Sequence, residues 1–186
     1  MLIFSVVLLD IIGIGVIFPI IPDLLKEVGI DQTASAAFWG GLLSSSYAFM
    51  QFVFSPTIGT LSDIFGRRPV LLMASLLLGI DYLLMGFAEN ILILFIGRII
   101  GGLAGGTIAT GTAYLADISD TKDKKKNFAI IGAAFGLGFI LGPIIGGLMG
   151  EISVRAPFFL SALLSFLNFI LSLFLLPESL ELKTKN

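Results

Sequence analysis

Residues 128–149 read FAIIGAAFGLGFILGPIIGGLM, and this stretch decides the class of fold. It contains 22 residues and no Asp, Glu, Lys or Arg. A helix of about 20 apolar residues is long enough to cross the hydrocarbon core of a bilayer. The stretch therefore predicts a transmembrane helix.

The rest of the chain shares this character. Of its 186 residues, 56% are hydrophobic and 13% are charged, and its mean hydropathy is +1.04. A soluble domain carries about 25% charged residues, so one aqueous core cannot enclose this much apolar surface, and lipid must be the main solvent. The chain has no cysteine and no histidine, which excludes disulfides, Cys/His zinc sites and catalysis by these residues.

Six apolar stretches follow one another along the chain, at 2–22, 38–58, 70–88, 91–116, 128–149 and 157–176. Six spans of about 20 residues use most of the chain and leave short loops. We therefore expect an all-α membrane protein: six transmembrane helices in one bundle over residues 1–177, then a tail over 178–186. Prolines 19 and 22 predict a bend at the end of the first helix.

The basic residues between these stretches predict the orientation, because short cytoplasmic loops are enriched in Lys and Arg. Eight lie on one side, which places both termini in the cytoplasm: Arg67, Arg68, Lys122, Lys124, Lys125, Lys126, Lys183 and Lys185. Only Lys26 and Arg155 lie on the other side. The run 122–126 could also bind lipid headgroups or nucleic acid, but a topology signal is the simpler interpretation. We expect the lipid bilayer, and no nucleic acid, as a partner.

Three ionisable residues interrupt the apolar stretches: Asp10, Asp81 and Arg98. A charge at the bilayer centre costs at least about 2.5–3.5 kcal/mol, so such residues usually face a bundle interior or a water-filled cavity and mark substrate or proton paths. The alternative is a structural one, in which they form a buried ion pair or reach the interface. Asp81 and Arg98 lie near the external ends of their helices, where they could pair with each other or face a vestibule.

These charges favour translocation over catalysis. A carboxylate in a low-dielectric cavity can exchange a proton near neutral pH, and it can choose between a proton and a cationic group on a substrate. No nucleophile–base pair, phosphate-cradling loop or metal-ligand cluster accompanies them. We therefore expect no enzyme activity, no metal site and no cofactor.

Glycines recur at four-residue spacing on two of the predicted helices, where backbones can approach closely. The groups are Gly97, Gly101 and Gly105 with Gly102 and Gly106, then Gly132 and Gly136, then Gly138, Gly142 and Gly146. Plain helix packing is the simplest interpretation. Sliding of helices along these faces would also suit a transporter.

The second loop reads GTLSDIFGRRPVL over residues 59–71. It resembles the G-x-L-(S/A)-D-x-x-G-R-(R/K) signature of the major facilitator superfamily, a conformational latch on the cytoplasmic side. The residues that match are Gly59, Asp63, Gly66, Arg67 and Arg68. For the arginines, a role in topology alone remains open.

Two helices resemble patterns of the drug/proton antiporters within that superfamily. Residues 10–22 are similar to D-x-x-G-x-G-x-x-x-P-x-x-P, and residues 138–147 are similar to G-x-x-x-G-P-x-x-G-G through Gly138, Gly142, Pro143, Gly146 and Gly147. Arg98 stands as in an R-x-x-(Q)-G motif implicated in proton transfer, but Gly101 stands where glutamine is common. That departure puts a hydrogen-bonded Arg–Gln pair in doubt.

Several further segments resemble the bacterial tetracycline/proton antiporters, among them 51–52, 81–82, 114–120, 156–159 and 176–179. This resemblance implies a proton/substrate pathway through Asp10, Gln51, Asp81 and Arg98. It implies exchange of protons for an amphipathic drug, with tetracycline carrying a divalent metal as a candidate. It also implies the bacterial cytoplasmic (inner) membrane.

The superfamily has twelve helices in two halves, each a 3+3 inverted repeat. The 186 residues here resemble only the N-terminal half. The substrate cavity normally lies between the halves, so the expected partner is a separate C-terminal six-helix half or a second copy. The alternative function is a truncated or split-gene remnant, or an interaction subunit, without transport activity of its own.

Overall fold

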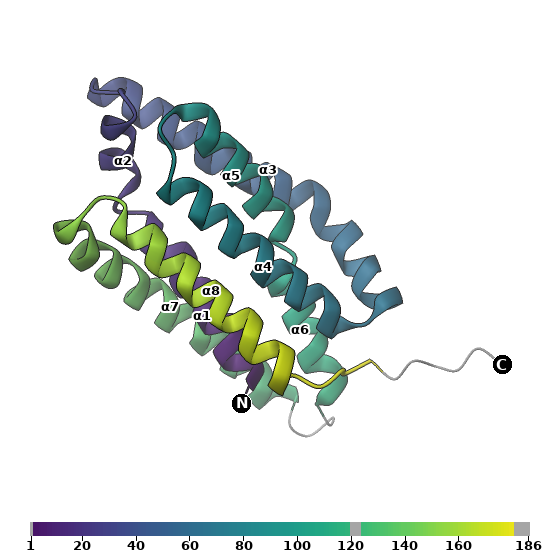
Figure 1. Ribbon diagram of the computed structural model, residues 1–186. Helices are drawn as coiled ribbons and strands as arrows, with labels where there is room; N and C mark the ends of the chain where they lie inside the picture. The colour runs from purple at the N-terminus through teal and green to yellow at the C-terminus, as the bar shows by residue number, and fades with distance from the viewer. Residues whose placement is uncertain (1, 120–123, 181–186) are drawn as a thin grey trace.

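The computed structural model describes residues 2–119 and 124–180 (Figure 1). Within them the chain is helical, and the helices line up as six rods. The elements are α1 (Leu2–Ile17), α2 (Ile21–Glu27), α3 (Thr33–Phe65), α4 (Arg67–Gly86), α5 (Ile91–Ala104), α6 (Thr107–Ile118), α7 (Lys124–Ile152) and α8 (Ala156–Leu175).

Two of the rods are interrupted. The first consists of α1 and α2, which meet at a bend of 54°. The bend follows from the prolines at 19 and 22, because proline cannot donate the backbone hydrogen bond that continues a helix, and it confirms the prediction. The fourth rod consists of α5 and α6, which are separated at Gly105 and Gly106.

By length and composition, four helical segments of the described chain could cross a membrane, and the bent pair α1–α2 makes a fifth. The four are Arg67–Gly86, Ile91–Ile118, Asn127–Ile152 and Ala156–Leu175. Helix α3, which contains the predicted span 38–58, is long enough at 33 residues, but serines 44–46 and Gln51 lower its apolarity. The count of six spans therefore stays a prediction.

The rods pack in a way that relates the first three to the last three. Helix α1 packs on α7 and α8, whereas α5 packs on α3 and α4, and α4 packs on α8 between the two groups. Figure 1 shows α3, α4 and α5 on one side of the bundle and α1, α7 and α8 on the other. Exchanging α1 with α5–α6, α3 with α7 and α4 with α8 reproduces these contacts, as an inverted repeat requires.

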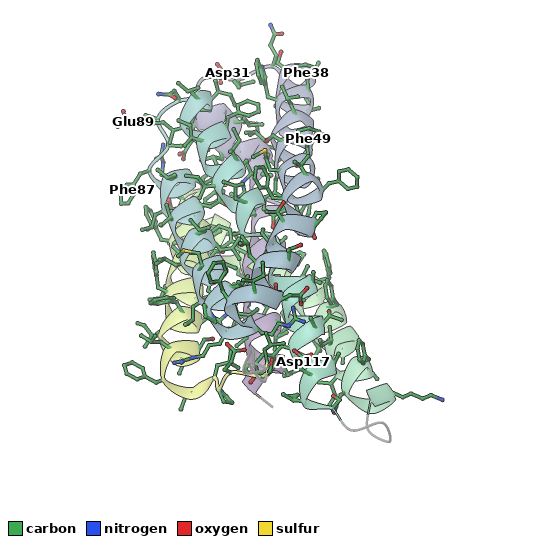
Figure 2. All side chains as sticks on the ribbon, turned by 90° about the vertical axis from the view of Figure 1, so that its right-hand side faces the viewer. Asp31, Phe38, Phe49, Phe87, Glu89 and Asp117 are labelled. Atoms are coloured by element: carbon green, nitrogen blue, oxygen red, sulfur yellow. The ribbon has the colours of Figure 1, made fainter. Side chains whose placement is uncertain are left out.

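The first turn of α1 and the end of α8 lie at the same end of the bundle (Figure 1). Asp117 lies at this end as well, opposite Asp31 and Glu89 (Figure 2). An even number of rods gives this arrangement. Lys122, Lys183 and Lys185, which helped to predict the orientation, lie outside the described residues, as do residues 181–186 of the predicted tail.

The bundle exposes large apolar side chains along its length, such as Phe52 (79% exposed), Phe174 (78%) and Ile152 (74%). Figure 2 shows Phe49 and Phe87 directed away from the bundle. Monomeric soluble proteins rarely expose apolar patches of this extent. This surface suits lipid and other helices rather than water.

Candidate functional site

The two charges predicted near one end of the bundle form a buried ion pair. Helix α4 carries Asp81, α5 carries Arg98, and Nη2 of Arg98 donates to Oδ2 of Asp81. The Asp81 side chain is fully buried and that of Arg98 is 8% exposed. Burying two charges is tolerated only when they are paired with good geometry. The structure thus brings together two residues that the sequence placed 17 positions apart.

The surroundings of the pair are shaped to hold it. The ring of Tyr47 on α3 lies 5.2 Å from Arg98 Cζ, a cation–π contact. On α5, a Cβ atom at Gly97 would lie 2.9 Å from Asp81 Oδ1, and one at Gly101 would overlap the Asp81 carboxylate. The glutamine that the resemblance expects at position 101 would therefore overlap the carboxylate of Asp81 in this arrangement.

A groove of about 300 Å³ runs beside this pair. Its polar lining includes Ser44, Tyr47, Gln51 and Arg98, and its apolar lining comes mainly from α1, the start of α2 and the link between them. It shares Phe18, Ile21 and Ser44 with a second hollow of about 430 Å³, which lies between α2 and α3 and reaches Lys26. The pathway residues Gln51 and Arg98 therefore face the smaller groove, which lies between α1 and α3.

Gln51 also contacts the break between α5 and α6 and holds it in place. Its Nε2 donates to the carbonyl oxygen of Gly105 at 3.0 Å. A Cβ atom at Gly105 would lie 2.5 Å from Gln51 Cγ, and one at Gly102 would lie 2.6 Å from Met50 Cβ. The glycines of α5 thus let α3 approach closely and place Gln51 at the groove.

Asp10 lies deeper than the groove and faces the bundle interior, with 2% of its surface exposed. Its Oδ1 accepts a hydrogen bond of 3.0 Å from Nδ2 of Asn168 on α8. A cavity of about 10 Å³, close to the smallest volume that can hold one water molecule, is lined by Asp10, Tyr47 and Gln51. Tyr47 and Gln51 therefore separate Asp10 from the groove.

The predicted latch residues gather at the opposite end of α4, around Arg67. The guanidinium of Arg67 pairs with Asp63 at 2.5 Å and with Asp117 of α6 at 3.0 Å. It also donates to Ser62 Oγ at 2.6 Å. One side chain thus ties the end of α3 and the end of α6 to the start of α4. The structure gives Gly59 no comparable role, because a Cβ atom there would meet nothing within 4 Å.

The segment after α8 completes this cluster. Glu178 accepts hydrogen bonds from the backbone N–H groups of Arg67, at 2.9 Å, and Arg68, at 3.2 Å, and so caps the N-terminus of α4. Gly66 turns the chain with φ +104°, and a Cβ atom there would overlap the Glu178 carboxylate. Arg68 Nη2 in turn donates to the carbonyl oxygen of Leu173 at 2.5 Å.

The glycines of the predicted antiporter motif form a seam between α7 and α1. Cβ atoms at Gly138, Gly142 and Gly146 would collide with Ile11, Gly15 and Val16, respectively. At Gly147, and at Gly132 and Gly136, a Cβ atom would meet nothing within 4 Å. Pro143 lies beside the seam and α7 continues through it.

No group of three or more Asp or Glu residues that could hold a metal ion occurs in the described part of the chain. Tyr47, Asn168 and Glu178 were not among the predicted site residues. Asn168 had a signal, since it is the single carboxamide in the stretch 157–176. The signal for Glu178 was its position in the short polar segment that follows the apolar stretch 157–176.

Comparison with known proteins adds sequence relatives. The chain is 44% identical over 177 residues to the tetracycline resistance protein, class C, of Escherichia coli, which covers 95% of the chain and 44% of that protein. It is 37% identical over 168 residues to the quinolone resistance protein NorA of Staphylococcus aureus, covering 90% and 42% respectively. The chain thus spans less than half the length of these relatives.

Solved structures share the fold. The human organic anion transporter MFSD10 (TETRAN) matches with a TM-score of 0.85 and 26% identity, over 96% of this chain and 47% of that one. The peptide transporter POT (E310Q mutant) matches in fold alone, with a TM-score of 0.76 and 18% identity over 92% of this chain and 36% of that one. The sequence profile of the Major Facilitator Superfamily matches residues 3–186, so the chain belongs to that superfamily of membrane transporters.

Proposed function

We propose that the chain is the N-terminal six-helix half of a proton-coupled antiporter that exports a drug-like amphipathic substrate. One observation carries the proposal: a groove lined by Gln51, Tyr47 and Arg98, with the buried carboxylate of Asp81 directly behind Arg98. Relatives named for resistance to tetracycline and to quinolones support a drug as substrate, and tetracycline is the first to test.

The groove suits a substrate that is partly apolar and partly polar. Ile14 and Ile17 of α1, with Phe18 directly after the helix, supply an apolar wall. Gln51 and Arg98 supply hydrogen-bond donors on the other side. Ligand sites combine a mostly apolar lining with a few placed polar groups. Arg98 would bind an anionic or carbonyl oxygen of the substrate, and a divalent metal would enter only as part of a substrate complex.

Proton coupling would use the two buried carboxylates. Protonation of Asp81 would leave the charge of Arg98 without its partner, and an unpaired buried charge is unfavourable. Arg98 would then turn toward the groove or toward water, and the groove would change its affinity for the substrate. Asp10, one small cavity away, would exchange the proton with the other side. Protons are the coupling ion, and the proposal includes no cofactor and no chemical conversion of the substrate.

The cluster around Arg67 would hold the bundle as one rigid body while the groove opens and closes. It joins α3, α4, α6 and the segment after α8 through charged hydrogen bonds, which are stronger than neutral ones. Alternating access in such transporters is largely a rocking of one whole bundle against the other.

The groove needs a second wall, which a separate C-terminal half or a second copy of the chain would supply. The bacterial cytoplasmic membrane is the proposed location. Both termini would be cytoplasmic, because basic residues gather on that side of the predicted topology.

The test uses Escherichia coli cells without drug pumps of their own, which express the chain either alone or joined to the C-terminal half of the class C relative. Accumulation of radiolabelled tetracycline is measured for the parent, for Asp10→Asn and for the matched control Asp31→Asn, in which an exposed loop carboxylate is lost. In the joined form, we expect the parent and Asp31→Asn to lower tetracycline accumulation several-fold relative to cells that express no pump. We expect cells with Asp10→Asn to accumulate as much tetracycline as cells that express no pump. If no form of the protein lowers accumulation, the proposal is contradicted.

A further inference from the structure

The internal repeat of the bundle places two buried polar pairs in related positions. Arg98 of α5 meets Asp81 of α4, and Asp10 of α1 meets Asn168 of α8. Each pair joins a helix of the first three rods to a helix of the last three. Because the repeat exchanges α5 with α1 and α4 with α8, the helices that carry the pair of Asp10 and Asn168 are the counterparts of those that carry the ion pair.

Asn168 is held in one orientation. It is 1% exposed, and its Nδ2 lies 3.0 Å from Asp10 Oδ1, 3.1 Å from the carbonyl oxygen of Val6 and 3.5 Å from Ser75 Oγ. An amide oxygen in that place would face the carboxylate and the carbonyl, which are both acceptors. The hydrogen-bond network therefore assigns the nitrogen to this side, which is how such amides are assigned.

The hydrogen bond from Asn168 matters more for the Asp10 carboxylate than for the backbone carbonyl of Val6. The carbonyl of Val6 lies inside α1, four residues before Asp10, and in an α-helix it accepts from the N–H of residue 10. It is thus satisfied without Asn168. Hydrogen bonds to a charged group are worth about twice those between neutral groups, so the contact with Asp10 dominates the role of Asn168.

We propose that Asn168 is a positioning residue for Asp10: its amide stabilises the ionised carboxylate and aims it at the small cavity that leads to Tyr47 and Gln51. The inference rests on the proposed function only in naming the proton as what Asp10 exchanges. Its consequence is that Asn168 sets how readily Asp10 takes up a proton.

Three tyrosines from neighbouring helices of the described chain surround the region of Asp10. Tyr47 of α3 lines the same cavity, Tyr82 of α4 lies against α1 at Gly13, and Tyr114 of α6 packs in the same apolar cluster as Val7 and Ile11. Helices α7 and α8 carry no ionisable residue over 127–150 and 156–175. Asn168 of α8 donates a hydrogen bond to Asp10 at 3.0 Å.

The test measures protonation of Asp10 without any transport. Infrared spectra of the full chain in lipid vesicles are recorded over a pH series, and the protonated-carboxyl band that is missing in Asp10→Asn is assigned to Asp10. Asn168→Leu removes the donor at similar volume. Loss of one hydrogen bond to a charged group predicts that the ratio of protonated to ionised Asp10 at a given pH rises about tenfold.

The matched control is Ser161→Ala, which removes another buried polar group of α8 that faces α1 through the carbonyl of Gly13 but touches no carboxylate. Its Asp10 titration should equal that of the parent. A ratio in Asn168→Leu within about twofold of the parent, well short of the change that one such bond makes, would overturn the inference.

If Asn168→Leu does not accumulate in the membrane, Asn168→Ser is judged by the same criterion. A second measurement uses the parent chain with ¹⁵N-labelled asparagine. Over the pH series, we expect the Nδ2 resonance of Asn168 to shift at the same pH as the infrared band of Asp10. A resonance that stays constant over the series would overturn the inference. A chain that shows the coupling but exports no tetracycline would refute the proposed function alone. Export with an uncoupled Asn168 would refute this inference alone.

Discussion

The glycine seam between α1 and α7 allows a prediction whose size follows from the structure. A Cβ atom at Gly142 would lie 2.7 Å from Gly15 Cα, 2.8 Å from Gly15 C and 3.0 Å from Val16 N. All three neighbours are backbone atoms, so no rotamer change can relieve the contact. Restoring an ordinary contact of 3.4 Å requires the two helices to separate, which we expect to cost about 1–3 kcal/mol, the usual cost of overpacking.

The matched control is Gly147→Ala on the same helix, where the added Cβ meets nothing within 4 Å. Both positions lie inside α7, so the helix-propensity gain of alanine over glycine, about 0.5–1 kcal/mol, cancels between them. Thermal unfolding of the purified chain, followed by the fluorescence of Trp39, compares the two variants directly. We expect Gly142→Ala to unfold at a temperature about 2–12 °C below that of Gly147→Ala, since about 1 kcal/mol moves the midpoint of a chain of this size by 2–4 °C.

Equal unfolding temperatures for the two variants would refute the reasoning. They would mean that α1 and α7 do not meet at Gly15 and Gly142, and the inverted-repeat packing built on that seam would fail with them. A lower temperature for both variants would point to a general intolerance of α7 to side chains.

Three other predictions concern the site and the latch. Arg98→Ala should destabilise the chain by about 3–5 kcal/mol, because it leaves a buried carboxylate unpaired, and adding Asp81→Asn should restore much of that loss in a double-mutant cycle of unfolding temperatures; additive losses would contradict the ion pair. Gly101→Ala should abolish tetracycline export in the joined form by displacing the Asp81 carboxylate, whereas Gly136→Ala on α7, with open space around it, should leave export unchanged. Equal export by both variants would contradict this packing. Glu178→Ala removes a cap worth about 0.5–2 kcal/mol and should speed hydrogen exchange in the first turn of α4, and unchanged exchange there would exclude the cap.

Much of the fold could be predicted from the sequence, because composition and stretch length depend on local properties. The bend at Pro19 followed from proline chemistry. Local patterns could not predict the environment of α3. Its length suits a membrane span, but its serines and Gln51 lower its apolarity. The structure explains two of these polar residues, because Ser44 and Gln51 line a groove.

For the candidate site, the sequence identified individual residues but not the partners that they contact. The sequence identified Asp10, Asp81 and Arg98, because charges in apolar stretches are expensive. It could not identify Asn168 as the donor to Asp10, since the two lie 158 positions apart and a lone asparagine costs less to bury than a charge. Spacing likewise groups glycines on one helix face, but only the packing shows that Gly138 meets α1 while others on α7 face outward.

The most direct test of the account is proton movement driven by the drug. Inverted membrane vesicles that contain the chain joined to the C-terminal half of the class C relative are acidified inside by respiration, and tetracycline is then added while a pH-sensitive dye reports the internal pH. The account predicts that tetracycline releases internal protons in the parent and in Asp31→Asn, and releases none in Asp10→Asn. Tetracycline uptake without proton release, or release that survives Asp10→Asn, would contradict it.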